Sequence, residues 1–462
     1  MLFPPVLLAQ YAGTLEIQDT SRIDARSNQP YTLAPTPPPR EVALASDASI
    51  APMARLRLSD RQWDYVLTYS PTFTVTDVEL ISESQPVVLN AGMASIGWHD
   101  RFLRVVVSES ASYGWEDLAY LYGTPVAGQT LAATQSQAPG QATGPATGPA
   151  TVQVPGQTSG QSLGQTGGSA AIPLQVFPFG SSSTTASVTM HETRSVTVNV
   201  SGGYSLTGNL TNNPAATTIY PEQYGPSAAA SVAYTMSRAD SLLTLASAQE
   251  ITTPVGVCVG GTAGQTCRQV APILLVEETA RHRLSPTANV SASLGVSGSI
   301  YPLATGEAWG ILPVGGVAYT DRFGAAPHDP RDLLEPSGVR LSADLAPTIN
   351  VFTGSPSNRV QLTASLVSRI APDVSVSFLA GALQTISFPR PDPSPLTLVN
   401  GGIDLRFRVT RLISVSAGVQ AFWENQQNVG VIPTAGATNG PTTLATEVGY
   451  VALTVRLPRL RL

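Results

Sequence analysis

The residues most often used for catalysis or metal binding are few and scattered in this chain. Four histidines are present, none near another in the sequence: His99, His191, His282 and His328. Their positions match no His and Cys spacing of a zinc site, and no glycine-rich phosphate loop joins a strand to a helix. No Ser, His and Asp set for nucleophilic catalysis can be singled out either. The sequence therefore predicts no enzyme, no metal site and no cofactor.

The two cysteines indicate a different chemistry. Cys258 and Cys267 lie nine positions apart in a segment rich in Gly and Thr. Two isolated thiols make a poor metal site, whereas this spacing suits one disulfide in an oxidising compartment. We expect the disulfide to close a short extracellular loop.

The N-terminus agrees with export from the cytoplasm. Residues 1–10 form a short apolar stretch in which Ala9 is a small residue suited to a cleavage site. A positively charged region before this stretch is missing, so we interpret 1–10 as the residual end of a secretory signal. The alternative is an ordinary apolar terminus.

Composition narrows the classes of protein further. Of 462 residues, 12% are charged and 42% are apolar, and the chain has 40 Gly and 38 Pro. No apolar run reaches the roughly 18 residues of a helical membrane span. All 25 basic residues are arginine, and the formal net charge is −6. The chain therefore lacks the excess of basic residues that is typical of a nucleic-acid-binding protein, and we expect no nucleic-acid partner.

Alternation of apolar and polar residues predicts strands throughout the chain. One segment shows the pattern most clearly, with two faces of opposite character: Ile403, Leu405, Phe407 and Val409 against Asp404, Arg406 and Arg408. Successive strand side chains point to opposite faces, so such a segment has one apolar and one polar face. The same pattern occurs in residues 63–76, 196–206, 290–296, 341–351, 360–366, 374–378, 413–419 and 451–457.

Strand length and loop order favour a membrane barrel over a soluble sheet. The segments run about ten residues or more, the length of a tilted membrane strand, and short turns alternate with long loops. Eighteen strands are predicted, starting near residues 11, 52, 62, 87, 102, 176, 195, 228, 241, 273, 288, 308, 339, 359, 373, 396, 412 and 445. We therefore predict an all-β fold: a single transmembrane antiparallel β-barrel of about 18 strands over residues 11–462, in a bacterial outer membrane.

Some segments depart from the simple pattern. The connection from Phe323 to Gly338 is long where a short periplasmic turn is expected, so it is either a partner-binding excursion or a misplaced strand pair. Glu109 falls on an apolar face, which suggests a bulge or a register shift. Residues 119–175 are rich in Gly, Pro, Gln and Thr and are expected to form a disordered extracellular loop. Several aromatics lie near strand ends, as in an interfacial girdle: Trp63, Tyr65, Trp98, Tyr113, Trp115, Tyr319, Phe422, Trp423 and Tyr450.

The predicted inner face indicates what the lumen could accept. It carries these charged residues among many Ser, Thr and Asn: Arg55, Arg57, Asp64, Arg104, Asp344, Asp404, Arg406, Arg408 and Arg456. Such a mixed wall suits a neutral or weakly charged hydrophilic solute better than a selected ion. Any water-facing wall would look similar.

The chain also resembles a known family, the outer-membrane β-barrels of myxobacteria that are encoded with exopolysaccharide-export machinery. The resemblance runs from about Ala54 to the C-terminus and rests on patterns of modest specificity: Tyr65-x-Leu67-x-Tyr69-Ser70-Pro71-x-Phe73, Ser201 to Leu206, Tyr224-Gly225-Pro226 leading into Val232-Ala233-Tyr234, and Ser237 to Leu242. The loop at 119–175 and the end Leu457 to Leu462 depart from the family.

The resemblance implies a function and partners. The function would be passage of a secreted polysaccharide across the outer membrane. The implied partners are outer-membrane lipid, the polysaccharide itself and a periplasmic polysaccharide-export protein without a membrane segment of its own. Two other functions stay open from the residues: a general diffusion porin, and a structural barrel that serves as a motility or envelope scaffold.

Overall fold

Strands make up nearly all of the regular structure in the computed structural model of this chain. The structure describes residues 12–28, 43–77, 86–117, 176–193, 195–209, 222–255, 267–303, 306–323, 334, 337–349, 356–386, 396–426, 442–458 and 460–461. The first ten strands are β1 Ala12–Asn28, β2 Ala43–Ser59, β3 Trp63–Tyr69, β4 Thr72–Asp77, β5 Pro86–His99, β6 Leu103–Asp117, β7 Val176–His191, β8 Val196–Asn209, β9 Gln223–Thr235 and β10 Asp240–Val255. The others are β11 Cys267–Arg283, β12 Ala288–Leu303, β13 Gly306–Arg322, β14 Gly338–Ile349, β15 Pro356–Ala371, β16 Val374–Ile386, β17 Leu396–Arg408, β18 Ile413–Gln426, β19 Thr442–Arg456 and β20 Leu460–Arg461.

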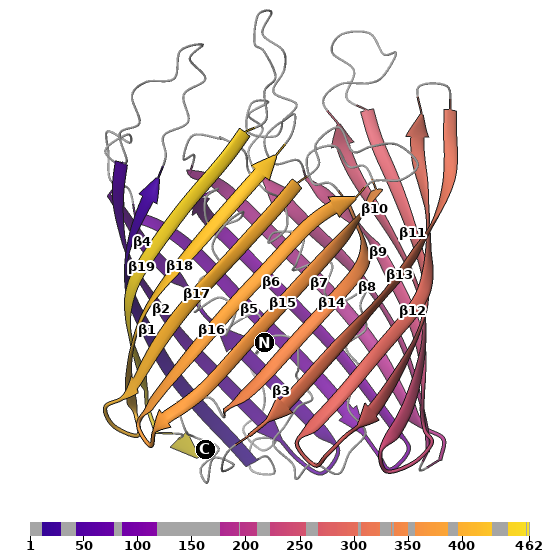
Figure 1. The fold of residues 1–462 in the computed structure, drawn as a ribbon. Helices are drawn as coiled ribbons and strands as arrows, with labels where there is room; N and C mark the ends of the chain where they lie inside the picture. The colour runs from indigo at the N-terminus through magenta and orange to yellow at the C-terminus, as the bar shows by residue number, and fades with distance from the viewer. Residues whose placement is uncertain are drawn as a thin grey trace, which may run out of the picture.

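These strands form one closed antiparallel sheet (Figure 1). β19 pairs with β1 from Gln18 opposite Arg456 to Ser27 opposite Glu447, which closes the barrel. β3 and β4 keep one register against both β2 and β5, so they are two parts of a single strand interrupted at Ser70 and Pro71. β20 has only two residues, which pair with Leu15 and Thr14 of β1, and does not cross the membrane. The barrel therefore has 18 membrane-crossing strands, which confirms the predicted fold class. No helix in the described part of the chain is long and apolar enough to cross a membrane.

Short turns join the strands at the lower end of the barrel in Figure 1. They cover residues 60–62, 100–102, 192–195, 236–239, 284–287, 372–373 and 409–412. Asp100 shows how such a turn is held: its Oδ1 accepts the backbone N–H groups of Phe102 and Leu103, each at 2.7 Å. The hydrogen bonds from Leu103 and Phe102 hold the pKa of the Asp100 carboxyl below its usual value.

One connection at this end is long, as the sequence indicated. β13 and β14 pair directly from Gly315 opposite Leu345 to Arg322 opposite Gly338, so the alternative of a misplaced strand pair is wrong. In the connection between them, Leu334 and Ser337 are buried. The Arg369 side chain on β15 donates to the Leu334 carbonyl at 2.7 Å, and the Arg369 backbone N–H donates to Ser337 Oγ at 2.9 Å. The connection, residues 323–337, is therefore attached to the barrel wall.

Most strand starts lie within three residues of the predicted positions, and three strands start earlier. β2 begins at Ala43 and not near 52, β9 at Gln223 and not near 228, and β11 at Cys267 and not near 273. The added residues of β2 include Ser46 and Asp47, which pair with Ala25 and Asp24 of β1. Ladder hydrogen bonds join backbones of any sequence, so they extend a strand beyond its apolar alternation.

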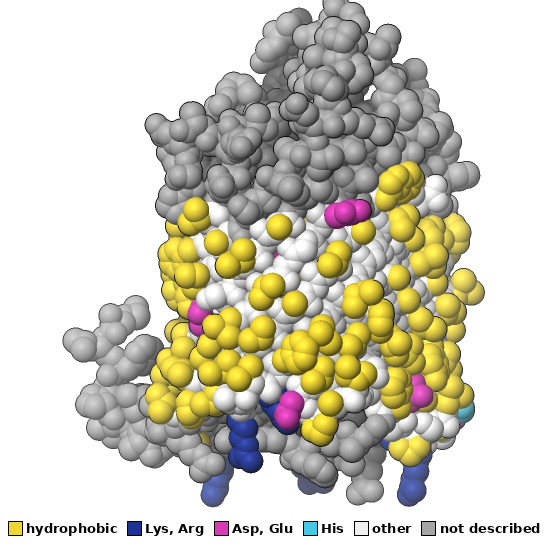
Figure 2. Space-filling view, turned by 60° about the vertical axis from the view of Figure 1, so that its left-hand side comes forward, with side chains coloured by type: hydrophobic (Ala, Val, Ile, Leu, Met, Phe, Trp, Pro, Cys, Tyr) yellow, Lys and Arg dark blue, Asp and Glu magenta, His cyan; other side chains and the backbone are white. Residues whose placement is uncertain are grey.

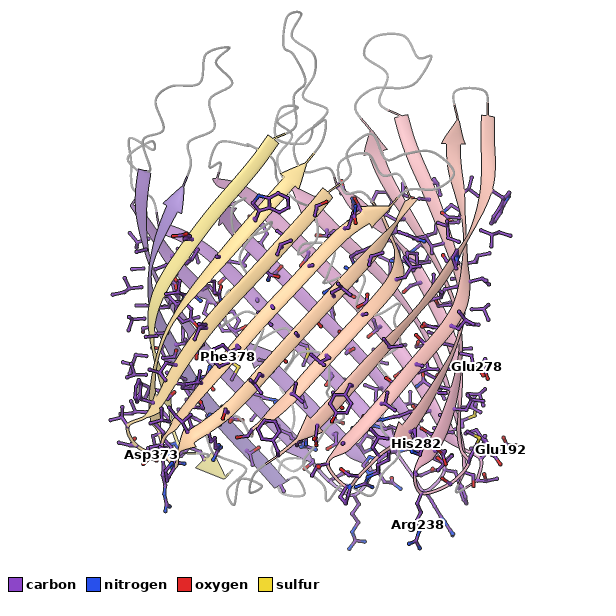
Figure 3. The ribbon with its side chains drawn as sticks, in the orientation of Figure 1. Glu192, Arg238, Glu278, His282, Asp373 and Phe378 are labelled. Carbon is purple, nitrogen blue, oxygen red and sulfur yellow. The ribbon has the colours of Figure 1, made fainter. Side chains whose placement is uncertain are left out.

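Apolar side chains cover the outer wall of the barrel (Figure 2). Ile403 is typical: it is 53% exposed and lies between Phe378 of β16 and Val419 of β18, which are also exposed. Phe378 is labelled on the outer wall in Figure 3. A soluble protein would bury such a surface, whereas a closed barrel in lipid exposes it. Near the turns, Trp63 lies opposite Trp98 and stacks on Tyr65 with ring centroids 6.1 Å apart, as in an interfacial girdle.

The expected bulge or register shift at Glu109 is wrong. β6 keeps an unbroken register with both β5 and β7, and Glu109 lies opposite Ala94 and Thr184 on the outer wall. Glu250 and Glu278 also lie on the outer face, Glu278 between Thr244 and Leu294. Acidic side chains cost less on a lipid face than arginine does. The arginines whose side chains the described strands place lie on the other face.

Three predictions lie outside the described residues. These are the residual signal segment at 1–10, the disordered loop at 119–175, and the disulfide, because Cys258 and the side chain of Cys267 are not described.

The orientation of β17 gives a first test. Ile403→Arg should lower the free energy of unfolding by about 2–4 kcal/mol, because it puts a guanidinium into lipid near the middle of the strand. Ser377→Arg is the matched control: Ser377 precedes Phe378 at the same height, faces inward and lies opposite Asp404. It should cost less than about 1 kcal/mol. Urea unfolding in lipid vesicles measures both, and equal costs would contradict the assigned faces.

Candidate functional site

The inner wall of the barrel is the candidate site. Residues directly opposite each other in a sheet share a face, so the registers extend the inner face from strand to strand. They place all nine predicted lumen residues on this face: Arg55, Arg57, Asp64, Arg104, Asp344, Asp404, Arg406, Arg408 and Arg456. Arg408 lies at the rim, where it donates to Asp373 Oδ1 at 2.5 and 2.8 Å and to the Pro372 carbonyl at 3.2 Å.

Arginines concentrate at one end of the inner wall. Arg283, Arg322 and Arg408 are the last residues of their strands. Eight more arginines lie within four residues of the short-turn end, and we call these eight the arginine collar: Arg55, Arg57, Arg104, Arg281, Arg340, Arg369, Arg406 and Arg456. The nine residues chosen from sequence missed Arg281, Arg340 and Arg369. Arg340 could have been found from the sequence, because it precedes the apolar Leu341 in a predicted strand and so falls on the polar face.

Part of the collar is held by polar neighbours. Arg57 lies 3.3 Å from Asp64, and His99 is 3.9 Å from the same carboxylate. Arg456 donates to Gln18 Oε1 at 3.0 and 3.3 Å and lies 3.8 Å from Glu16. These contacts fix the guanidinium groups against the wall.

The other members differ in how they are engaged. Arg281 donates to Asn289 Oδ1 at 2.9 and 3.2 Å. Arg55, Arg104 and Arg340, in contrast, have no hydrogen bond or ion pair within the described part of the chain.

A second feature of the inner wall is a continuous stretch of hydroxyl groups on β6, β7 and β8. We call it the hydroxyl face, and it comprises Ser108, Ser110, Ser112, Ser181, Ser183, Thr185, Ser187, Thr189, Thr197, Ser201, Ser205 and Thr207, with the amide of Asn199 among them. Ser108 and Thr185 hydrogen bond at 2.7 Å, Ser112 and Ser181 at 2.6 Å. A hydroxyl both donates and accepts hydrogen bonds, so this face can bind sugar hydroxyls or water without a charge.

A row of side chains crosses the strands where the barrel closes. Asp404, Gly418, Tyr450 and Asp24 lie opposite one another on β17, β18, β19 and β1. The Tyr450 ring lies over Gly418 and its hydroxyl donates to Asp404. Arg22 forms an ion pair with Asp24 and lies 4.0 Å from the centre of the Tyr450 ring. Tyr450 is buried on the inner face, so its prediction as a girdle residue is wrong.

The inner wall also has an apolar patch, which the sequence did not indicate. Leu245, Leu275 and Val314 are buried together on β10, β11 and β13, with Ala229 of β9 against them. β10 has leucine at two successive positions, Leu242 and Leu243, so period two alone does not tell which face is apolar. The lumen wall is therefore not uniformly polar.

No metal or catalytic site emerges in the described residues. No group of three or more His, Cys, Asp and Glu side chains there could hold a metal ion. The described histidines lie at the short-turn end, where His282 pairs with Asp240 at 2.6 Å and His191 contacts Thr197 at 3.2 Å. Each of these contacts joins two neighbouring strands close to a turn, as expected of a histidine at a strand end.

The strand ladder is closed, the outer wall is apolar and the inner wall is mainly polar. These features indicate a barrel that spans a membrane. The chain is a bacterial outer-membrane β-barrel. No protein-family model and no curated protein matches it. Among solved structures it is similar to the FrpB iron transporter from Neisseria meningitidis, at 7% identity and a TM-score of 0.45, covering 96% of this chain and 81% of the transporter.

Two other solved structures give similar values. The siderophore receptor PirA from Acinetobacter baumannii has 8% identity and a TM-score of 0.44, with 95% of this chain and 80% of the receptor covered. The RagAB peptide importer has 8% identity and a TM-score of 0.42, with 91% and 63% covered. Identities this low say nothing about the solute, and the fold assignment rests on the strand pairing itself.

The row at the closure can be tested through Gly418. A Cβ there would lie 2.7 Å from the Ile403 carbonyl oxygen and 2.8 Å from the Tyr450 ring. Gly418→Ala should therefore displace Tyr450 and lower the free energy of unfolding by about 1–3 kcal/mol. Gly401→Ala is the control, because its Cβ would meet only the Leu379 carbonyl at an ordinary 3.7 Å. Urea unfolding followed by tryptophan fluorescence compares the two, and a loss no larger for Gly418→Ala would remove the packing role.

Proposed function

We propose that this barrel is an outer-membrane channel through which a polysaccharide is secreted. The hydroxyl face carries the proposal: a band of Ser and Thr side chains runs along the inner face of three neighbouring strands. A polysaccharide presents hydroxyl groups at every sugar, and each can exchange hydrogen bonds with such a wall. The arginines add planar guanidinium donors.

A transported polymer needs many weak contacts. A net hydrogen bond in water contributes only about 0.5–1.5 kcal/mol, and tight binding at one position would stall a moving chain. The serine and threonine hydroxyls already bond to each other, as Ser108 and Thr185 do, so a sugar replaces one partner with another at little net cost. Barrels of about this strand number leave an aqueous interior when nothing fills them.

The connection 323–337 supports a partner on the periplasmic side. It is the long exception at the short-turn end and is attached to β15 through Arg369. We propose that it docks a periplasmic polysaccharide-export protein, which delivers the polymer to the barrel. Because Leu334 and Ser337 contact Arg369, a partner bound to this connection would be held next to the barrel wall.

A general diffusion porin is the second candidate. The same polar inner wall would pass small hydrophilic solutes, and the porin would need no export partner. A structural barrel used as an envelope or motility scaffold would not conduct.

A deletion strain tests the function directly. Loss of surface polysaccharide in the strain without this chain, restored by the wild-type chain, is the expected result. Normal surface polysaccharide would remove the export function. Conductance in planar bilayers then separates a porin from a non-conducting scaffold.

Removing part of the long connection tests docking. Deleting residues 325–333 keeps Leu334 and Ser337, which contact Arg369, so the barrel should fold and insert normally. Secretion should nevertheless fall severely, because the partner loses its contact. Deleting the equally long stretch 430–438 at the opposite end is the control. Normal secretion after the first deletion would remove the docking role.

A further inference from the structure

Charge is distributed unevenly between the two walls of this barrel. The chain as a whole has a formal net charge of −6, yet the arginine collar faces the lumen. At the same height, the inner-face carboxylates of the described strands are Glu16, Asp64 and Asp404. The eight arginines of the collar therefore outnumber these three carboxylates, even without Arg283, Arg322 and Arg408 at the strand ends.

The turns at the same end carry charges of both signs. Arg61, Arg101, Arg238 and Arg411 are exposed and lie in four different short turns. Arg238 projects below the barrel in Figure 3, and arginine side chains extend below the apolar band in Figure 2. The short turns at this end also carry the carboxylates Asp60, Asp100, Glu192 and Asp373, so the excess of positive charge lies in the collar and not in the turns.

Farther from this end, the described strands show no excess of arginine on the inner face, where Glu277 adds a carboxylate to the two pairs that follow. Arg22 pairs with Asp24. Arg359 lies diagonally across from Asp344, because it is two residues before Gln361, the residue opposite Asp344 on β15. Within the described strands, the excess of arginine on the inner face therefore lies at the periplasmic mouth. A cleft of one sign between low-dielectric walls focuses its field and raises the local concentration of the opposite charge.

We infer that the polymer which enters this mouth is a polyanion, a sugar chain with carboxylate, sulfate or phosphate groups. This inference rests on the proposed function and replaces the neutral or weakly charged solute that the sequence favoured. Guanidinium forks bind all three groups in a bidentate manner. Arg55, Arg104 and Arg340 have no partner in the described residues, so they are available to the polymer.

The collar also explains how such a chain could still move. Exposed ion pairs contribute only about 0.2–1 kcal/mol each, and the arginines are distributed around the mouth on strands from β2 to β19. An anionic group leaving one arginine therefore meets another, and no single pair holds the chain.

Binding of a defined polyanion to the purified full chain tests the site. The probe is fluorescent dextran sulfate, with uncharged dextran of equal length as its control. The wild-type barrel should bind dextran sulfate in a salt-sensitive manner and bind dextran far more weakly. Combining Arg55→Gln, Arg104→Gln and Arg340→Gln should weaken binding by about tenfold. The three Lys replacements should retain most of it.

Ion selectivity gives a second measurement. In a KCl gradient across a planar bilayer, the reversal potential should indicate anion preference and move toward cations in the triple Gln variant. The control variant removes equal charge from the turns through Arg61→Gln, Arg101→Gln and Arg238→Gln, and it should change binding and selectivity less. An equal or larger effect of this control would place the site on the turns and overturn the assignment to the collar.

Two outcomes would overturn the inference itself: equal binding of dextran sulfate and dextran, or binding unchanged by the triple Gln substitution. Neither depends on secretion or on an open channel. If polyanion binding fails while the deletion strain loses its polysaccharide, only the charge of the polymer is wrong. If binding holds while the strain keeps its polysaccharide, the export function fails and the polyanion site stays.

Discussion

The structure depends on one constraint: lipid offers no hydrogen-bond partner to the backbone. Each exposed N–H or C=O group in the hydrocarbon would cost several kcal/mol, so a sheet in the membrane has to close on itself. The pairing of β1 with β19 meets this need. Closure then separates two solvents, lipid outside and water inside, and alternate side chains of every strand belong to one or the other. The polar inner wall follows from this separation.

Much of the fold could be predicted from the sequence. Lipid outside and water inside the barrel require apolar and polar residues to alternate along each strand. The faces of β17 were readable since Ile403 and its outward neighbours meet lipid while Asp404 and Arg406 do not. Turn positions were readable because each short connection carries Asp, Ser, Thr or Pro between two alternating segments. The even number of strands also followed from the order of short and long connections.

Other features depended on neighbours that a single strand does not show. Tyr450 looks like an interfacial aromatic until Gly418 on the next strand provides the space for its ring. Leu245 looks like a lipid-facing residue until Leu275 and Val314 lie beside it on the inner side. Glu109 breaks the apolar pattern without breaking the ladder, because the backbone pairs whatever its side chains are. The alternation of apolar and polar residues can be read from one strand alone. Contacts between side chains on different strands can be predicted only when the register of the strands is known.

The closure between β1 and β19 has a consequence for how the barrel forms. Arg456 and Gln18, which meet there, are 438 residues apart in the chain, whereas all other neighbours are joined by single connections. Loop-closure entropy makes the contact with the greatest sequence separation the last to form. The Tyr450 row lies at this joint and adds side-chain contacts across four strands. We therefore expect neighbouring strands to pair first, as hairpins in an open sheet, and β19 to pair with β1 last. The barrel is closed only after that final pairing.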